Sequence, residues 1–126
     1  MRVLIADDNV DAASTLRALL EMWGHDVQEV HDGERSLEIA GAFRPHVMLL
    51  DIGMPKLNGY EVAQEMRRRE PEVGKPILVA ITGWGQEQDR TRAREAGFDV
   101  HLTKPLDPME LEELLKQHGS LLNGQG

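Results

Sequence analysis

A run of four apolar residues leads directly into a single carboxylate and limits the choice of fold. Val47-Met48-Leu49-Leu50 precedes Asp51, and Gly, Pro, Asn and Gly residues follow within the next eight positions. A continuous apolar run bounded by turn residues is typical of a strand buried on both faces, and the Gly/Pro/Asn cluster predicts a loop. We therefore expect Asp51 at the carboxyl end of a central strand, where open α/β sheets bind ligands.

The rest of the chain repeats a strand followed by a helix, five times in all. Short apolar runs predict strands over residues 3–6, 47–51, 77–81 and 100–102, and a weakly alternating polar segment predicts one over residues 26–30. A helical segment follows each strand. Such a repeat predicts a parallel sheet with helices on both faces. The first, third and fourth strands are wholly apolar and suit the interior of the sheet, whereas the second and fifth suit its edges. We therefore predict a flavodoxin-like (βα)5 α/β fold, a doubly wound parallel sheet of strand order 2-1-3-4-5.

The composition limits the size, the partners and the location of the protein. The 126 residues are enough for one domain, expected over residues 1–119 with a disordered tail over 120–126. The formal charge of −8 argues against a general affinity for nucleic acid or anionic membranes. No cysteine is present, and no apolar run is long enough for a signal peptide or a membrane helix. We expect a cytoplasmic protein with no membrane insertion.

Charged and hydroxyl side chains gather at the predicted strand ends. Asp7 and Asp8 end the first strand, Asp51 ends the third, Thr82 ends the fourth and Lys104 follows the fifth. The switch point of this strand order lies between strands 1 and 3. At about 5 Å and an effective dielectric near 20, each ionised carboxylate pair costs about 3 kcal/mol. One lysine does not offset that repulsion fully, whereas a hard divalent cation such as Mg²⁺ does.

Each of these residues also has a structural explanation when it is considered singly. Asp8 can help Asn9 to cap the first helix, and Thr82 can cap the fourth. Asp51 can be a turn residue, and Lys104 can be ordinary surface charge. The four strand ends together favour a functional site. In that site one carboxylate can attack a phosphoryl group and form an aspartyl phosphate, while Mg²⁺ and Lys104 balance the charge of its oxygens.

This combination resembles the receiver domain of two-component response regulators, similar to chemotaxis regulators. The matching segments cover nearly the whole chain: 4–9, 49–55, 58–59, 81–83, 96–99 and 102–105. The sequence of residues 82–87 and 97–102 is more similar to receivers of hybrid sensor kinases than to transcription regulators. The resemblance implies that Asp51 takes a phosphoryl group from the phosphohistidine of a sensor histidine kinase or a histidine phosphotransfer protein.

The resemblance also implies the roles of the other site residues. Asp7 and Asp8 form the acidic pair of the Mg²⁺ site, with Asp8 a direct ligand, and Asp51 and the Gly53 carbonyl complete the protein ligands. Lys104 pairs with the phosphoryl group. The switch residues are Thr82, His101 and Pro105, with Pro105 expected to follow a cis peptide bond. His101 departs from the family pattern, because Tyr or Phe is usual there and imidazole is smaller and titratable.

The resemblance implies a switch that phosphorylates and dephosphorylates itself, not a multiple-turnover enzyme. Its output is expected through protein contacts of helix 4 (residues 86–96), strand 5 (residues 100–102) and the last helix, helix 5. We expect a monomer or weak dimer with no output domain in this chain. Helix 4 offers only Ala93 and Ala96 as apolar anchors, so we expect it to be among the least stable elements. The arginines at positions 67–69 are expected to be a solvated helix end.

Three competing functions are weighed against this one. A phosphatase of the haloacid dehalogenase type also uses a nucleophilic aspartate, but it needs a second acid where Gly53 stands. An FMN-binding flavodoxin would place phosphate near Asp7 and Asp8, which repel it. An adaptor that uses the fold without phosphorylation has no need of the complete acidic set.

Overall fold

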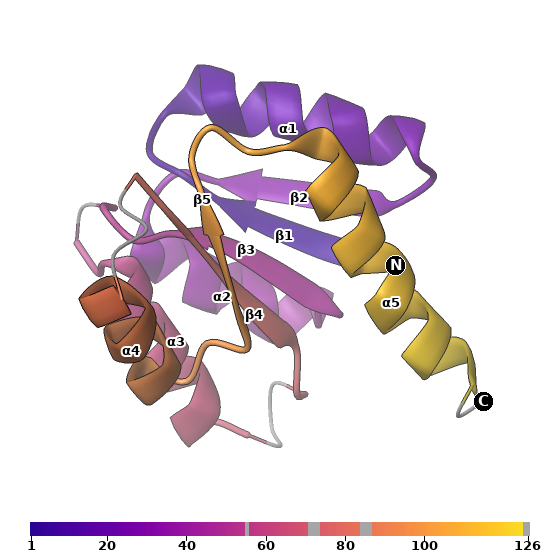
Figure 1. Cartoon of the computed structure of the whole chain (residues 1–126). Coiled ribbons are helices and arrows are strands. Elements are labelled where there is room, and N and C mark those ends of the chain that lie inside the picture. The colour runs from indigo at the N-terminus through magenta and orange to yellow at the C-terminus, as the bar shows by residue number, and fades with distance from the viewer. Residues whose placement is uncertain (55, 71–73, 84–86, 125–126) are drawn as a thin grey trace.

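The computed structural model describes residues 1–54, 56–70, 74–83 and 87–124, and these contain five strands that alternate with five helices (Figure 1). The strands are β1 (Arg2–Ala6), β2 (Asp26–Val30), β3 (Val47–Asp51), β4 (Ile77–Thr82) and β5 (Val100–Thr103). The helices are α1 (Val10–Met22), α2 (Gly33–Phe43), α3 (Gly59–Arg68), α4 (Glu87–Ala96) and α5 (Pro108–Gly124).

The strands form one parallel sheet in the order β2-β1-β3-β4-β5, which confirms the predicted flavodoxin-like fold. The central strands β1, β3 and β4 are the ones with solid apolar runs, and their side chains are almost entirely buried. In register, Leu4 lies beside Met48 and Leu50 lies beside Ala80. Burial on both faces explains why these strands carry no alternation of apolar and polar residues.

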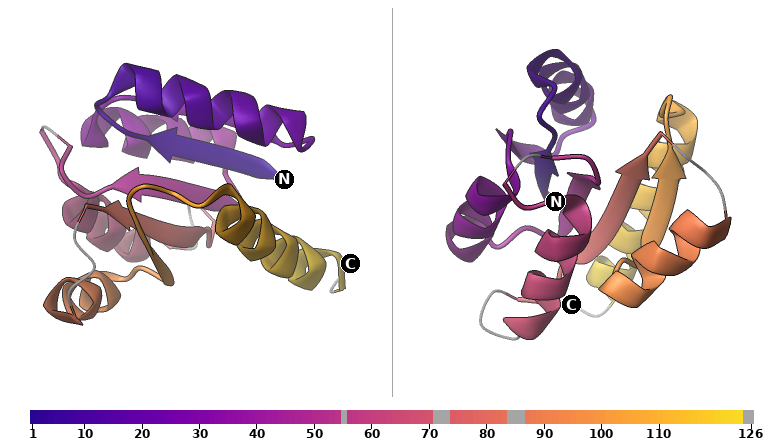
Figure 2. Two further views of the ribbon diagram at one scale, coloured as in Figure 1. Left: turned by 45° about the horizontal axis from the view of Figure 1, so that its top comes forward. Right: turned by 90° about the vertical axis from the view of Figure 1, so that its left-hand side faces the viewer.

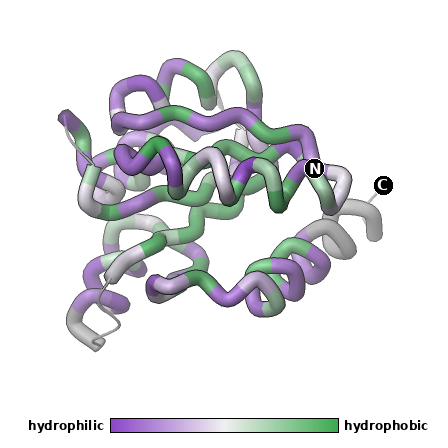
Figure 3. The backbone as a smooth tube through the Cα atoms, turned by 90° about the horizontal axis from the view of Figure 1, so that it is seen from above, coloured by the Kyte–Doolittle hydropathy of each residue, from purple (hydrophilic) through white to green (hydrophobic). Residues whose placement is uncertain are grey.

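Two layers of helices cover the sheet (Figure 2). Alternate strand residues point to opposite faces, so Val3 and Ile5 belong to the core beneath α1 and α5, whereas Leu4 and Ala6 belong to the core beneath α2, α3 and α4. Along the backbone the apolar residues gather in the strands and the polar residues in the helices and loops (Figure 3). This pattern leaves the loops at the carboxyl ends of the strands as the place for polar chemistry.

Capping residues fix where three of the helices begin. The side chains of Asn9 and Asp32 accept hydrogen bonds from backbone N–H groups in the first turns of α1 and α2. At α3, Asn58 and Glu61 form a reciprocal capping box. The loops after β1 and β3 therefore end at defined points, and both loops carry the predicted site residues.

Two details differ from the sequence-based expectations or extend them. Helix α5 is helical to Gly124, beyond the predicted boundary at residue 119, and the disorder of residues 120–126 stays a prediction. The solvated end expected for the arginines is wrong for Arg67, whose side chain is only 23% exposed. Its Nε donates to the Gly97 carbonyl at 2.8 Å and its Nη2 lies 2.6 Å from Asp99, so it joins α3 to the segment that leads into β5.

Candidate functional site

Three carboxylates meet at the carboxyl edge of β1 and β3. Asp7 and Asp8 directly follow β1, and Asp51 is the last residue of the neighbouring strand β3. One carboxylate oxygen from each residue lies within 4.8 Å of the other two. Asp7 is buried, Asp51 is partly buried and Asp8 is exposed. The structure thus brings together the acidic residues predicted from the sequence, with an open side at Asp8.

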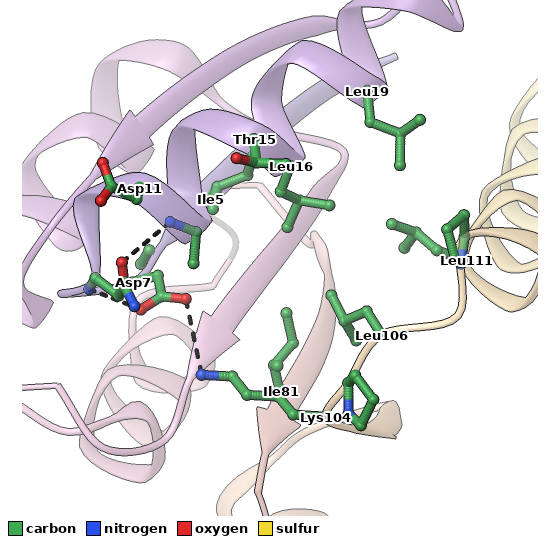
Figure 4. A pocket seen from close by; sticks show the side chains of 15 residues that line it. Ile5, Asp7, Asp11, Thr15, Leu16, Leu19, Ile81, Lys104, Leu106 and Leu111 are labelled. Atoms are coloured by element: carbon green, nitrogen blue, oxygen red, sulfur yellow. Dashed lines mark hydrogen bonds and ion pairs between the residues drawn. The ribbon is translucent and has the colours of Figure 1, made fainter.

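Lys104 reaches the acidic cluster from the loop after β5. Its Nζ lies 3.8 Å from Oδ2 of Asp7 (Figure 4). It also lies 3.5 Å from Oδ2 of Asp51. Its backbone N–H donates to the carbonyl of Thr82 at 2.8 Å, which ties the start of this loop to the end of β4. The peptide bond between Lys104 and Pro105 is cis, as predicted.

Backbone N–H groups hold two of the carboxylates in place. The N–H of Asn9 donates to Oδ1 of Asp7 at 2.9 Å. The N–H of Gly53 donates to Oδ1 of Asp51 at 3.2 Å, so the loop after β3 orients the carboxylate at its own beginning. Each of these bonds leaves the Oδ2 oxygen of its aspartate directed at Lys104.

Burial and charge both act on the protonation of Asp7. Burial raises the pKa of this carboxyl above its usual value, and the nearby charge of Asp51 raises it further. The hydrogen bond from Asn9 and the ammonium of Lys104 act in the opposite direction but do not cancel the rise. The cluster thus holds more negative charge than its one lysine neutralises.

The donor set fits Mg²⁺. All of the cluster's side-chain donors are carboxylate oxygens, which are the ligands that hard divalent cations prefer. The exposed position of Asp8 leaves the site open to water, and Mg²⁺ usually keeps several water ligands. Burial is the main cause of the raised pKa of Asp7, and a divalent cation would offset the added repulsion from Asp51.

Thr82 and His101 lie on the face of the sheet that α3 and α4 cover. Thr82 is the buried last residue of β4, next to the end of β3, where Asp51 pairs with Ile81. Because side chains alternate, Thr82 shares the face of Ala80. His101 on β5 lies opposite Ala80 in register and so shares that face. The two predicted switch residues are therefore on one side of the sheet, one strand apart.

A glycine closes the loop that follows Asp51. The N–H of Gly59 donates to the carbonyl of Ile52 at 3.0 Å, which brings the first residue of α3 back against the strand end. A Cβ at Gly59 would lie 2.9 Å from Cα of Ile52 and 3.0 Å from the carbonyl oxygen of Asp51. Both neighbours are backbone atoms, so only glycine fits without moving the segment that carries the candidate phosphoacceptor.

An apolar groove beside the acidic cluster was not predicted from the sequence. A cavity of about 810 Å³ lies between α1 and α5, and Asp7 and Lys104 are at one end of it (Figure 4). Its apolar lining includes Leu16, Leu19, Leu106 and Leu111. The spacing of Leu16 and Leu19 indicated an inward face of the first helix, but both side chains are only partly buried. Pro55 and residues 84–86, which also carry the family resemblance, lie outside the described residues.

Comparisons with known proteins agree with this geometry. The response regulator receiver domain family matches residues 3–116. The DNA-binding dual master transcriptional regulator RpaA of Synechocystis is 37% identical over 121 residues, which are 96% of this chain and 48% of that protein. An uncharacterized 14.6 kDa protein of Leptolyngbya boryana is 34% identical, over 94% of this chain and 89% of that protein. The chain thus spans about half the length of RpaA.

A solved structure with a metal ion is also similar. It is the receiver domain of sensor histidine kinase PA1611 from Pseudomonas aeruginosa, with a magnesium ion coordinated in the active site cleft. It is 29% identical with a TM-score of 0.84, and the match covers 94% of this chain and 98% of that one.

In the part of this chain that the structure describes, every helix is too short or too polar to cross a bilayer.

Proposed function

Because the chain belongs to the response regulator receiver domain family, we propose that it is a phosphoacceptor in a two-component phosphorelay, with Asp51 as the acceptor. The observation that carries the proposal is the position of Asp51 at the end of β3. Its carboxylate lies within 4.8 Å of those of Asp7 and Asp8 and 3.5 Å from the ammonium of Lys104. A nucleophile, a cation and an oxygen-rich metal site are thus gathered at one edge of the sheet.

The proposed reaction transfers a phosphoryl group from a phosphohistidine to Asp51. A carboxylate oxygen of Asp51 forms a bond to phosphorus, and the bond between phosphorus and the donor's imidazole nitrogen breaks. The imidazole keeps the electron pair of that bond and takes up a proton. Since phosphoryl transfer depends mainly on positioning and on charge stabilisation, the site needs no further acid or base.

Residues around Asp51 divide the remaining tasks. Asp8, Asp51 and the Gly53 carbonyl would hold Mg²⁺ with the support of Asp7, and the bound ion would neutralise charge on the phosphoryl oxygens. Lys104, already 3.5 Å from Asp51, would pair with the phosphoryl group. The Thr82 hydroxyl, at the end of the adjacent strand, would hydrogen-bond a phosphoryl oxygen and so couple β4 to the modified state.

The proposed readout is the face formed by α4, β5 and α5. Thr82 and His101 lie on the α4 side of β4 and β5, so a change at the site reaches that face through two adjacent strands. A sensor histidine kinase or a histidine phosphotransfer protein is the proposed donor. A cytoplasmic location and a monomeric or weakly dimeric state are the further expectations from the sequence.

Intact-mass spectrometry tests the proposal. The wild-type protein is incubated with a small phosphodonor such as acetyl phosphate, with and without Mg²⁺, beside Asp51→Asn. We expect one phosphoryl adduct that requires both Mg²⁺ and Asp51. Asp26→Asn is the matched control, because Asp26 is an exposed aspartate on β2 outside the acidic cluster, and it should form the adduct normally. An adduct that persists in Asp51→Asn would overturn the assignment of the acceptor. No adduct under any condition would overturn the phosphoacceptor function and favour an unphosphorylated adaptor.

A further inference from the structure

His101 is partly exposed, but its two ring nitrogens are buried in a way that elementary hydrogen-bond chemistry disfavours. Both ring nitrogens have less than 1 Å² of exposed surface, and neither has a hydrogen-bond partner among the described residues. A buried polar atom without a partner destabilises the fold. Such atoms are rare in native structures and call for an explanation.

A cavity lies beside this ring. It has a volume of about 410 Å³, and its lining joins α4, β5 and α5 through Arg90, Arg94, Asp99, His101 and Glu110. Liquid water takes about 30 Å³ per molecule, so the space is large enough for a ring that leaves its buried position to meet water. The ring is hydrated in the cavity but not in its buried position. A charged ring gains most from this hydration.

The charges around the ring come from every element that packs against β5. On α4, Arg90 and Arg94 are positive and Asp89 is negative, whereas on α5 Glu110 is negative. Asp99, the residue before β5, is already paired with Arg67. Thr82 on β4 shares the face but carries no charge.

These surroundings favour the neutral ring in the buried position. Burial lowers the pKa of His101, and the charge of Arg90 lowers it further, against a smaller opposing effect of Asp89. Because its pKa is lowered in the buried position, the ring is stable there above its ordinary pKa, and that stability is lost as the pH falls.

We propose that His101 is a proton-controlled latch of the α4–β5–α5 face, buried when neutral and turned into the adjoining cavity when protonated. In the cavity the imidazolium is hydrated and Glu110 on α5 attracts it. Helix α4 then loosens, because its only buried side chains among the described residues are those of Ala93 and Ala96. The consequence for signalling rests on the proposed function, since β5 leads directly into Lys104.

Hydrogen exchange of the unphosphorylated protein tests the latch. Protection factors of α4 amides are measured at pH 7.5 and 5.5, corrected for intrinsic exchange, with the amides of β1 as the internal reference, while ring ¹⁵N shifts report the protonation of His101. We expect α4 protection to be about tenfold lower at pH 5.5 than at pH 7.5. His101→Phe keeps a ring that does not titrate and should show no such fall, and Glu110→Gln should weaken it.

The outcomes separate this inference from the proposed function. An equal loss of α4 protection in His101→Phe, or protonation of His101 with α4 unchanged, would overturn the latch. Neither result depends on Asp51, because the protein is not phosphorylated in the experiment. Failure of the phosphoryl adduct would overturn the proposed function and leave the pH dependence of α4 as measured. If the latch and the proposed function are both correct, the difference in adduct formation between the wild type and His101→Phe should change from pH 7.5 to pH 5.5.

Discussion

The ionised form of Asp7 is unfavourable at its position in the acidic cluster. Its pKa is raised by burial and by Asp51, so its stabilising contribution is complete below its ordinary pKa of 3.8 and is lost as the pH rises through the folded-state value. At neutral pH the ionised carboxylate therefore destabilises the metal-free protein. Because the ionised carboxylate lowers the stability, we infer that Asp7 has a role other than stabilising the fold.

Replacement of Asp7 should therefore stabilise the metal-free protein. We expect Asp7→Asn to raise the free energy of unfolding at pH 7 by about 1 kcal/mol, because asparagine keeps the oxygen that accepts from Asn9 and removes the charge. Urea denaturation in EDTA measures this, and the gain should disappear near pH 3, where the wild-type carboxyl is protonated. Asp26→Asn, on the surface of β2, should change little. A less stable Asp7→Asn at pH 7 would contradict the argument.

The elements differ in how far the sequence predicts them. Strand order, edge strands and the strand-end carboxylates follow from periodicity and topology, because each depends on short segments and on general rules of parallel sheets. The bonds of Arg67 to Gly97 and Asp99 join residues about thirty positions apart, and no local pattern distinguishes Arg67 from Arg68. The unpartnered nitrogens of His101 and the groove between α1 and α5 likewise depend on how the helices pack, which only the structure shows.

The loop between β3 and α3 has a strict steric requirement. In Gly59→Ala, the added Cβ would meet backbone atoms of Asp51 and Ile52 at about 3 Å. We expect a loss of about 1–3 kcal/mol in stability and slower adduct formation, because the strand end must shift. Gly41→Ala is the matched control: a Cβ there meets nothing within 4 Å, and the change should stabilise α2 slightly. If the two variants had equal stability and equal adduct formation, the loop would accommodate the added Cβ, which would contradict the steric argument.

Helix α4 should be less protected than the central strands. Its buried described residues are alanines, whereas α3 buries Tyr60, Val62 and Met66. Arg92 of α4 stacks over the ring of Tyr60 at 4.2 Å and adds one further link to α3. We expect α4 amides to exchange faster than those of β3 and to change on phosphorylation. Exchange as slow as in β3, and unaffected by a phosphodonor, would remove α4 from the proposed readout.

At the scale of the whole molecule, a net charge of −8 and an acidic cluster make stability depend on cations in two ways. Any salt screens the general repulsion, whereas a specific site adds stability as RT ln(1 + [Mg²⁺]/Kd), or about 1.4 kcal/mol for each tenfold rise above Kd. Thermal unfolding in MgCl₂ and in NaCl of equal ionic strength separates the two effects. We expect the melting temperature of the wild type to rise more in MgCl₂.

Substitution within the cluster shows whether that difference belongs to the site. In Asp8→Asn and Asp51→Asn the two salts should act alike, because the carboxylates that would hold the ion are incomplete, whereas Asp26→Asn should keep the wild-type difference. Asp8 is exposed, so its replacement should leave the fold intact and make the comparison direct. If MgCl₂ stabilised all four proteins equally, the effect would be screening of net charge, and the acidic cluster would have no part in it.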